Sequence, residues 1–346
     1  MVYSSATAPA VRLNTKPWLA LHDSLASAAA AWAKLPSTST DSRLVLLGDS
    51  IVERLTGGSL NFGKSPCFGA AGCPCGHRAR AYPPCGCHYR GLANNSMTSP
   101  RSHGQPSLTE DSRRCGPPPP PPPPPLLLGI AGDATQHLLW RLEHGELAPL
   151  QQLRRLLVVL VVGTNNLGVY HHTPDATADG VVAVARLLLE RTHARVLVSA
   201  LLPRGATDET ETELAARCSP PAANDTAGSF IARVAAVNSR LRIALPKLLV
   251  AAPAREPART AGGAAAAARA SSMHARLCFA DCADAFMDGG RVNASRMPDL
   301  LHPNAEGYGA LWRCLGPRAA ACGLGEDAGE LISRQQHGAP SAAACT

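Results

Sequence analysis

The sequence predicts an α/β protein, organised as a three-layer α/β/α sandwich around a five-stranded parallel sheet. Five short aliphatic runs alternate along the chain with segments of helical periodicity. Each run is apolar at successive positions, as expected for parallel strands that are covered by helices on both faces. Polar turns follow the runs, and ligands bind such sheets beyond the carboxyl ends of their strands.

The five predicted strands stop at turns that contain glycine, proline or aspartate. In chain order they are Arg43–Gly48, Leu126–Ile130, Leu156–Val162, Arg195–Leu202 and Leu277–Ala280. Parallel strands need crossover connections, because a tight hairpin joins only antiparallel neighbours.

Apolar residues at helical spacing predict the crossover helices. After a short helix start at Ile51–Leu55, the helical segments are Thr135–Leu147, Asp175–Arg191, Ser229–Leu245 and 307–315. Asp133 stands where an N-cap would precede the Thr135 helix.

We expect one domain over residues 43–323, an N-terminal extension over 1–42 and a flexible tail over 324–346. A low-complexity insertion at 57–125 interrupts the domain, and it holds 15 of the 30 prolines, ten of the 30 glycines and six of the 12 cysteines. Its last nine residues, Pro117–Pro125, predict a stiff polyproline II rod.

The net charge of the chain is +7, and the insertion alone carries +5 of it. The rest of the domain is therefore close to neutral, and we expect no nucleic-acid partner.

The longest aliphatic run, Leu156–Val162, has seven residues and is too short to span a bilayer. The N-terminus lacks the basic-then-apolar pattern of a secretory signal. We therefore expect a cytoplasmic protein whose cysteines are reduced.

Four short polar motifs stand at predicted strand ends or just before the last helix: Gly48-Asp49-Ser50, Gly132-Asp133, Gly163–Asn166 and Asp299–His302. A serine becomes a good nucleophile only when a base takes its proton, and a histidine base needs a carboxylate that fixes its tautomer. Ser50, His302 and Asp299 supply these three groups.

An ester hydrolase also needs donors for the developing oxyanion. The backbone N–H groups of Ser50 and Gly132 and the side-chain amide of Asn165 are the candidates. Each candidate also has a structural interpretation: Ser50 and Asn165 could cap helices, Gly132 could serve a turn, and Asp299-x-x-His302 could be a surface turn before Pro303. Asp49 is expected to order its loop by hydrogen bonds.

In this order, the four motifs resemble the SGNH (GDSL) hydrolase superfamily, whose pattern is Ser, Gly, Asn and Asp-x-x-His. Longer strings resemble the catalytic alpha subunits of intracellular platelet-activating factor acetylhydrolase type IB. These strings are LLGDSIV (46–52), GIAGDATQHLLWRLEHGEL (129–147), VVGTNN (161–166), LLPRG (201–205), MPDLLHPNAEGY (297–308) and, more weakly, PWLALH (17–22).

The resemblance implies a flavodoxin-like SGNH hydrolase fold, with Ser50 as nucleophile, His302 as base and Asp299 as orienting carboxylate. It implies an oxyanion hole of Ser50, Gly132 and Asn165, with no cofactor and no metal. It further implies hydrolysis of short acyl esters, typically acetyl esters of phospholipids or other alcohols. A homodimer and a WD-repeat regulatory partner are the implied assemblies.

Two departures from the family pattern concern substrate and dimer contacts. About 80 residues separate Ser50 from Gly132, where the family has a short link. After the Asn motif the chain reads Asn166-Leu167-Gly168, where the alpha subunits continue Asn-His-Gly.

The sequence leaves several alternatives open. The substrate could instead be an acetylated carbohydrate, a lysophospholipid or a thioester, or the chain could be a non-catalytic scaffold whose site the insertion covers. The insertion also holds zinc-type ligands at a spacing tighter than usual, and its proline run could fit a partner's groove or act as a spacer. Arg204 is either a functional arginine of a Pro-Arg-Gly loop or a plain surface residue.

Overall fold

The computed structural model describes residues 4–12, 15–36, 42–56, 123–205, 228–248 and 276–324. The predicted insertion lies outside these residues except for its final three prolines, so its zinc-type cluster and most of its proline run lie outside them too. The tail predicted from residue 324 lies outside them beyond its first residue.

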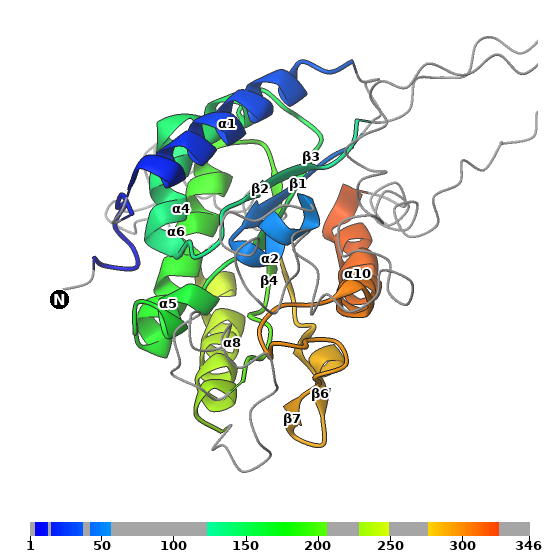
Figure 1. The fold of residues 1–346 in the computed structure, drawn as a ribbon. Helices are drawn as coiled ribbons and strands as arrows, with labels where there is room; N and C mark the ends of the chain where they lie inside the picture. The colour runs from blue at the N-terminus through cyan, green and yellow to red at the C-terminus, as the bar shows by residue number, and fades with distance from the viewer. Residues whose placement is uncertain are drawn as a thin grey trace, which may run out of the picture.

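The predicted five-stranded parallel sheet is confirmed, and its strand order is β2-β1-β3-β4-β5 (Figure 1). The strands are β1 (Arg43–Gly48), β2 (Leu126–Gly129), β3 (Leu156–Val161), β4 (Arg195–Ser199) and β5 (Leu277–Ala280). This order places the topological switch point between β1 and β3, where the connections leave toward opposite sides.

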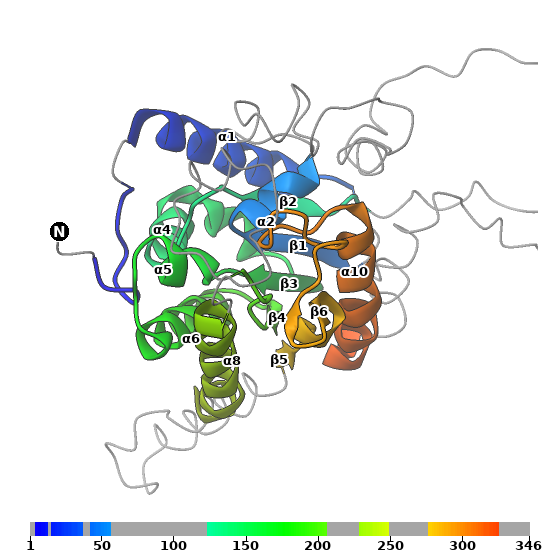
Figure 2. The same ribbon diagram turned by 60° about the horizontal axis from the view of Figure 1, so that its bottom comes forward.

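Helices cover both faces of the sheet. One face carries α1 (Thr15–Ala33), α4 (Thr135–Arg141), α6 (Pro174–Arg191) and α8 (Gly228–Leu248). The other face carries α2 (Ser50–Glu53) and α10 (Ala305–Ala319), and Figure 2 shows α10 across the sheet from α6 and α8. None of the helices in the described part of the chain is long and apolar enough to cross a membrane.

Successive residues of the central strands pack on opposite faces, as the continuous apolar runs predict. In β1, Val45 and Leu47 belong to the core under α1, α4, α6 and α8, whereas Leu44 and Leu46 belong to the core under α2 and α10. All six residues of β1 are buried. The sheet is therefore enclosed by two hydrophobic layers.

The N-terminal segment, expected as an extension, contributes to the first of these layers. Ala29 and Trp32 of α1 are buried in the core under α4 and α6. In Figure 1, α1 runs along the outside of the helical layer beside α4.

The strands predicted to end at Ile130 and Val162 each end one residue earlier. Two other predicted elements are several residues too long, for identifiable reasons. The strand predicted at Arg195–Leu202 ends at Ser199, because the Asn238 side chain bonds both the N–H and the C=O of Leu201 at 2.9 Å. The helix predicted at Thr135–Leu147 ends at Arg141, and a wider turn follows over Leu142–Glu146. Gly145 in that turn has a φ of +135°, which ends regular helix.

The predicted N-cap role of Asp133 is wrong. The helix N-cap is Ala134, and the Asp133 carboxylate instead accepts from the side chains of Trp18 and Arg141. A buried charge is satisfied better by an arginine than by one backbone N–H.

The expectation of reduced cysteines is wrong for the four cysteines in the described residues. They form two disulfides, Cys278–Cys322 and Cys282–Cys314, each with a Cα–Cα distance of 5.9 Å. Both bonds join β5 or the loop that follows it to α10 or its C-terminal extension. They fasten the last helix to the edge of the sheet.

We predict that both disulfides are present in the purified, unreduced protein. Peptide mapping after alkylation should recover Cys278 linked to Cys322 and Cys282 linked to Cys314. Reduction should lower the melting temperature, because bonds that close loops of this size stabilise folded proteins by about 2–4 kcal/mol each. Alkylation of all four cysteines without a reductant would contradict the pairing.

Candidate active site

Ser50 stands at the first position of α2, directly after the carboxyl end of β1. The turn is fixed by Asp49, whose Oδ1 accepts the Ile51 N–H at 3.0 Å and caps the helix. Gly48 is required because a Cβ there would collide with the Val161 carbonyl of the neighbouring strand. The expected ordering role of Asp49 is therefore confirmed, and Ser50 itself is not the cap.

Three predicted residues from distant parts of the chain form a continuous hydrogen-bonded relay. Ser50 Oγ lies 2.9 Å from His302 Nε2, and His302 Nδ1 lies 2.7 Å from Asp299 Oδ2. Ser50 and His302 are 1 % and 2 % exposed. Buried hydrogen bonds of this length require well-fixed side chains, and the loop before α10 supplies that order.

The loop fixes Asp299 through its second carboxylate oxygen. Asp299 Oδ1 accepts the backbone N–H groups of Leu301 at 3.1 Å and His302 at 2.7 Å. Leu300, which follows Asp299 and precedes these two residues, has a φ of +57°, and this left-handed residue turns the chain back on the carboxylate. Oδ2 thus stays directed at the imidazole.

The electrostatics of the relay favour an ionised Asp299. Burial works to raise the pKa of its carboxyl, but His302 and Arg54 outweigh burial and hold that pKa well below its usual range. The Arg54 Nη2 lies 3.3 Å from Asp299 Oδ2. An ionised carboxylate is the form that stabilises an imidazolium.

Of the predicted oxyanion residues, Ser50 begins α2, and Gly132 and Asn165 lie on two neighbouring segments that are joined by a hydrogen bond. Gly132 adopts a φ of +80° in the turn after β2, a conformation that favours glycine. Asn165 belongs to α5 (Thr164–Gly168), and its Nδ2 donates to the Asp133 carbonyl at 2.9 Å. The asparagine amide is thereby fixed against the Gly132 loop.

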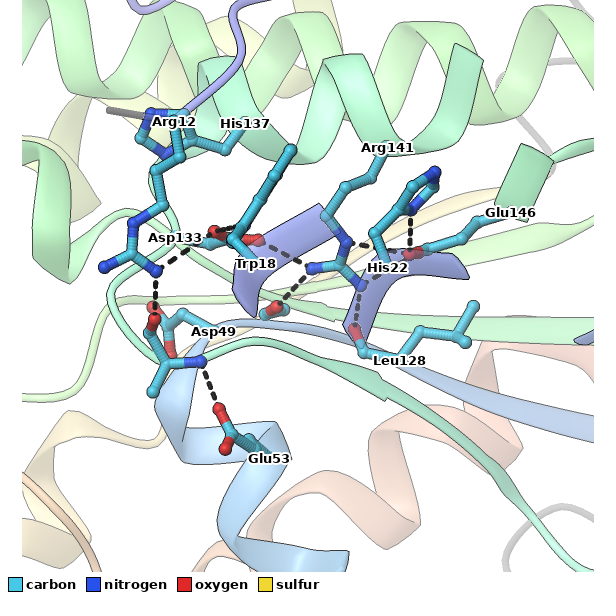
Figure 3. Close-up of polar contacts among 12 residues, drawn as sticks. Arg12, Trp18, His22, Asp49, Glu53, Leu128, Asp133, His137, Arg141 and Glu146 are labelled. Atoms are coloured by element: carbon cyan, nitrogen blue, oxygen red, sulfur yellow. Dashed lines mark hydrogen bonds and ion pairs between the residues drawn. The ribbon is translucent and has the colours of Figure 1, made fainter. Parts of the chain in front are cut away.

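A fully buried arginine, Arg141 of α4, binds Asp133, the residue after Gly132 (Figure 3). Its guanidinium bonds Glu146 through Nε and Nη2, both at 2.8 Å. It also bonds Asp133 at 2.8 Å and the carbonyls of Leu128 at 3.1 Å and Gly48 at 3.4 Å. All five of its N–H donors are used, which matches the donor capacity of a guanidinium.

Within the Arg141 cluster, Arg141 and Glu146 are held in their charged forms. Burial works to lower the pKa of Arg141, but Glu146 and Asp133 outweigh it and raise that pKa. Burial works to raise the pKa of Glu146, but Arg141 and His22 lower it. The ion pair between Arg141 and Glu146 therefore persists away from solvent. At Asp133, burial outweighs the nearby arginines and raises the pKa of the carboxyl.

Helix α1 completes the cluster with two aromatic side chains. Trp18 Nε1 donates to Asp133 Oδ1 at 2.7 Å, and His22 Nδ1 lies 3.0 Å from Glu146 Oε1. The bond with Glu146 raises the pKa of His22 although burial opposes it. Trp18 and His22 lie in the PWLALH string, but the string by itself gave them no role.

His137 of α4 also lies beside the cluster, and it is neutral. Burial, reinforced by Arg12 and Arg141, lowers its pKa to about 3. Its Nδ1 accepts the Ala134 N–H at 3.0 Å, a bond that the imidazolium could not make.

Two further charged residues, Arg204 and Glu53, bind the backbone of segments near the site. Arg204 is buried rather than on the surface, and its Nη1 donates to the Thr164 carbonyl at 3.1 Å. Glu53 of α2 accepts the Ala131 N–H, one residue before Gly132. Within the part of the chain that the structure covers, no group of three His, Cys, Asp or Glu side chains is placed to hold a metal ion.

A parallel sheet in the order 2-1-3-4-5, with a Ser–His–Asp relay and a Gly–Asn pair at its carboxyl edge, has the arrangement of an SGNH-type acylhydrolase. Residues 121–310, more than half of the chain, match the model of the GDSL-like Lipase/Acylhydrolase family. The chain belongs to this family.

Curated relatives match shorter stretches. The alpha1 subunit of platelet-activating factor acetylhydrolase IB from Homo sapiens is 51 % identical over 81 residues, which are 23 % of this chain and 32 % of that protein. The alpha2 subunit from Rattus norvegicus is 33 % identical over 124 residues, 36 % of this chain and 43 % of that protein. The chain thus spans 32 % of the length of the first relative and 43 % of the length of the second.

Similar solved structures include a putative platelet activating factor from Streptococcus pneumonia. It has a TM-score of 0.44 and 15 % identity, covering 87 % of this chain and 94 % of that one. A variant of Axe2, an acetyl xylan esterase from Geobacillus stearothermophilus, has a TM-score of 0.36 and 13 % identity, covering 82 % and 95 %.

We predict that Arg141→Met strongly destabilises the protein, because it leaves two buried carboxylates without their counter-charge. Such losses cost about 3–5 kcal/mol. Arg240→Met is the matched control, since Arg240 pairs with Asp175 on the surface, where both side chains are more than half exposed. The control should cost under about 1 kcal/mol. Urea unfolding of both variants measures the difference, and equal costs would contradict the role given to Arg141.

Proposed function

We propose that this chain is a serine esterase that hydrolyses short-chain acyl esters, acetyl esters above all, through an acyl-enzyme. The observation that carries the proposal is the relay from Ser50 Oγ through His302 to Asp299, with bonds of 2.9 and 2.7 Å. Membership of the acylhydrolase family supports the ester as the substrate class.

In the first half of the reaction, His302 Nε2 takes the proton of Ser50 Oγ, which attacks the acyl carbonyl carbon. Asp299 holds the imidazole in the tautomer that leaves Nε2 free to accept, and it stabilises the imidazolium that forms. The carbonyl oxygen becomes an oxyanion. His302 then gives the proton to the leaving alcohol, and the acyl group remains on Ser50.

The oxyanion is held by the Ser50 and Gly132 N–H groups and the Asn165 amide. Asn165 Nδ2 has a second hydrogen besides the one given to the Asp133 carbonyl. A donor already fixed in place stabilises the transition state without reorganisation. In the second half, His302 deprotonates a water molecule, which attacks the acyl carbon and releases the acid and Ser50.

The acetyl preference rests on two supports. Two curated relatives are subunits of a platelet-activating factor acetylhydrolase, although each match covers less than half of the relative. Ser50, at the start of α2, is almost wholly buried against the loop before α10, which favours a small acyl group.

We predict that purified protein hydrolyses p-nitrophenyl acetate and that Ser50→Ala lowers kcat/KM by about 10⁴-fold or more. Ser199→Ala is the matched control, because Ser199 is also buried but lies in β4 and donates to the Ala200 carbonyl. This control should retain wild-type turnover. Wild-type turnover no faster than that of Ser50→Ala would refute the esterase.

A substrate series separates the acyl preference from the reaction itself. Acetyl, butyryl and octanoyl esters of p-nitrophenol should rank in that order of kcat/KM. Acetylated phospholipid should then be hydrolysed faster than an acetylated sugar. The reverse rankings would overturn the acetyl or the phospholipid preference and leave the Ser50-dependent esterase standing.

A further inference from the structure

Arg54 contacts Asp299, the carboxylate of the relay. It follows α2 directly, and its own N–H donates to the Ser50 carbonyl, so it lies one helical turn beyond the nucleophile. From there its side chain reaches the loop before α10, where Nη2 lies 3.3 Å from Asp299 Oδ2. The nucleophile's helix and the carboxylate's loop are joined by this ion pair.

Arg54 shares a single oxygen with His302. Asp299 Oδ2 accepts from His302 Nδ1 at 2.7 Å and from Arg54 at 3.3 Å, whereas Oδ1 accepts only from backbone N–H groups of its own loop in the described bonds. The arginine therefore competes with the imidazole for the negative charge of Oδ2. A longer, weaker bond to Arg54 leaves the histidine as the main partner.

The ion pair between Arg54 and Asp299 is partly shielded from solvent, so its charges influence each other strongly. The side chains of Arg54 and Asp299 are 14 % and 23 % exposed. Partly buried pairs are screened by salt much less than exposed ones, and fixed charges a few ångströms apart shift each other's protonation. Asp299 shows this effect, because Arg54 contributes to holding its pKa below the usual range.

We propose that Arg54 is a positioning residue of the relay, which acts through Asp299: it holds Oδ2 in place and makes His302 a weaker base that works at lower pH. This inference rests on the proposed esterase function. In the described bonds, Ser50 from α2 and Asp299 from its own loop contact the His302 ring, and Arg54 from the turn after α2 contacts Asp299. Of these, only Arg54 carries positive charge.

The direction of the effect follows from charge. Protonated His302 is stabilised by Asp299 and destabilised by Arg54. Removing the Arg54 charge should therefore raise the pKa of His302, so that activity is lost at a higher pH as the solution is acidified. A charge one side chain away from an ionisable group in a partly hydrated site shifts that group by about half a pH unit to one unit.

The test compares Arg54→Gln with Arg54→Lys through the pH dependence of kcat/KM for p-nitrophenyl acetate. Arg54→Gln should move the acidic limb upward by about half a pH unit or more, measured against its own alkaline plateau. Arg54→Lys preserves the charge and should restore the wild-type limb. Arg240→Gln, which removes an exposed arginine on α8, is the control and should not move the limb.

A second readout needs no turnover. The downfield Nδ1 proton of His302, assigned by its absence in His302→Ala, can be titrated by proton NMR in wild type and in Arg54→Gln. An unchanged or lowered midpoint in Arg54→Gln would overturn the inference, as would an equal upward shift in Arg54→Lys. If wild type shows no Ser50-dependent turnover, the esterase fails instead, and the NMR titration still decides the role of Arg54.

Discussion

The site depends on the hydrogen bonds and ion pairs that the buried guanidinium of Arg141 makes. It ties together the end of β1 through the Gly48 carbonyl, β2 through the Leu128 carbonyl, and the Gly132 loop through Asp133. These three segments carry or precede Ser50 and Gly132. The second carboxylate, Glu146, balances the charge and brings His22 of α1 into the same cluster. A buried cation without both carboxylates would be far less stable than a neutral side chain.

The relay is built on this rigid side of the sheet, and its other half comes from the C-terminal loop. Asp299 and His302 precede α10, which two disulfides fasten to β5 and the loop after it. Tyr308 of α10 also donates to the Ile51 carbonyl in α2. His302 is thus held against Ser50 by contacts between two parts of the chain that lie more than 250 residues apart. Preorganised geometry of this kind is what acyl transfer requires.

Much of this arrangement could be predicted from the sequence. The aliphatic runs define the strands because both faces of a parallel sheet are buried, and the polar motifs after them indicate which edge holds the site. The contacts between residues that are distant in the chain have no local pattern in the sequence. Arg141 lies in an ordinary helical pattern. Only the fold shows that it binds Asp133, eight residues earlier, and Glu146, which also contacts His22. Likewise Arg54 resembles any helix-terminal arginine until Asp299 is brought beside it. The sequence does not predict the disulfides, because composition and the lack of a signal pattern do not show which distant cysteines lie side by side in the fold.

The central claim is that the fold makes Ser50, and no other serine, a nucleophile that His302 activates. Labelling with a fluorophosphonate probe and mapping the adduct by mass spectrometry tests it most directly. Trypsin cuts after Arg43 and Arg54, so the account predicts one adduct, on the peptide Leu44–Arg54, which disappears in His302→Ala. An adduct on a different peptide, or a wild-type protein that the probe does not label, would contradict it.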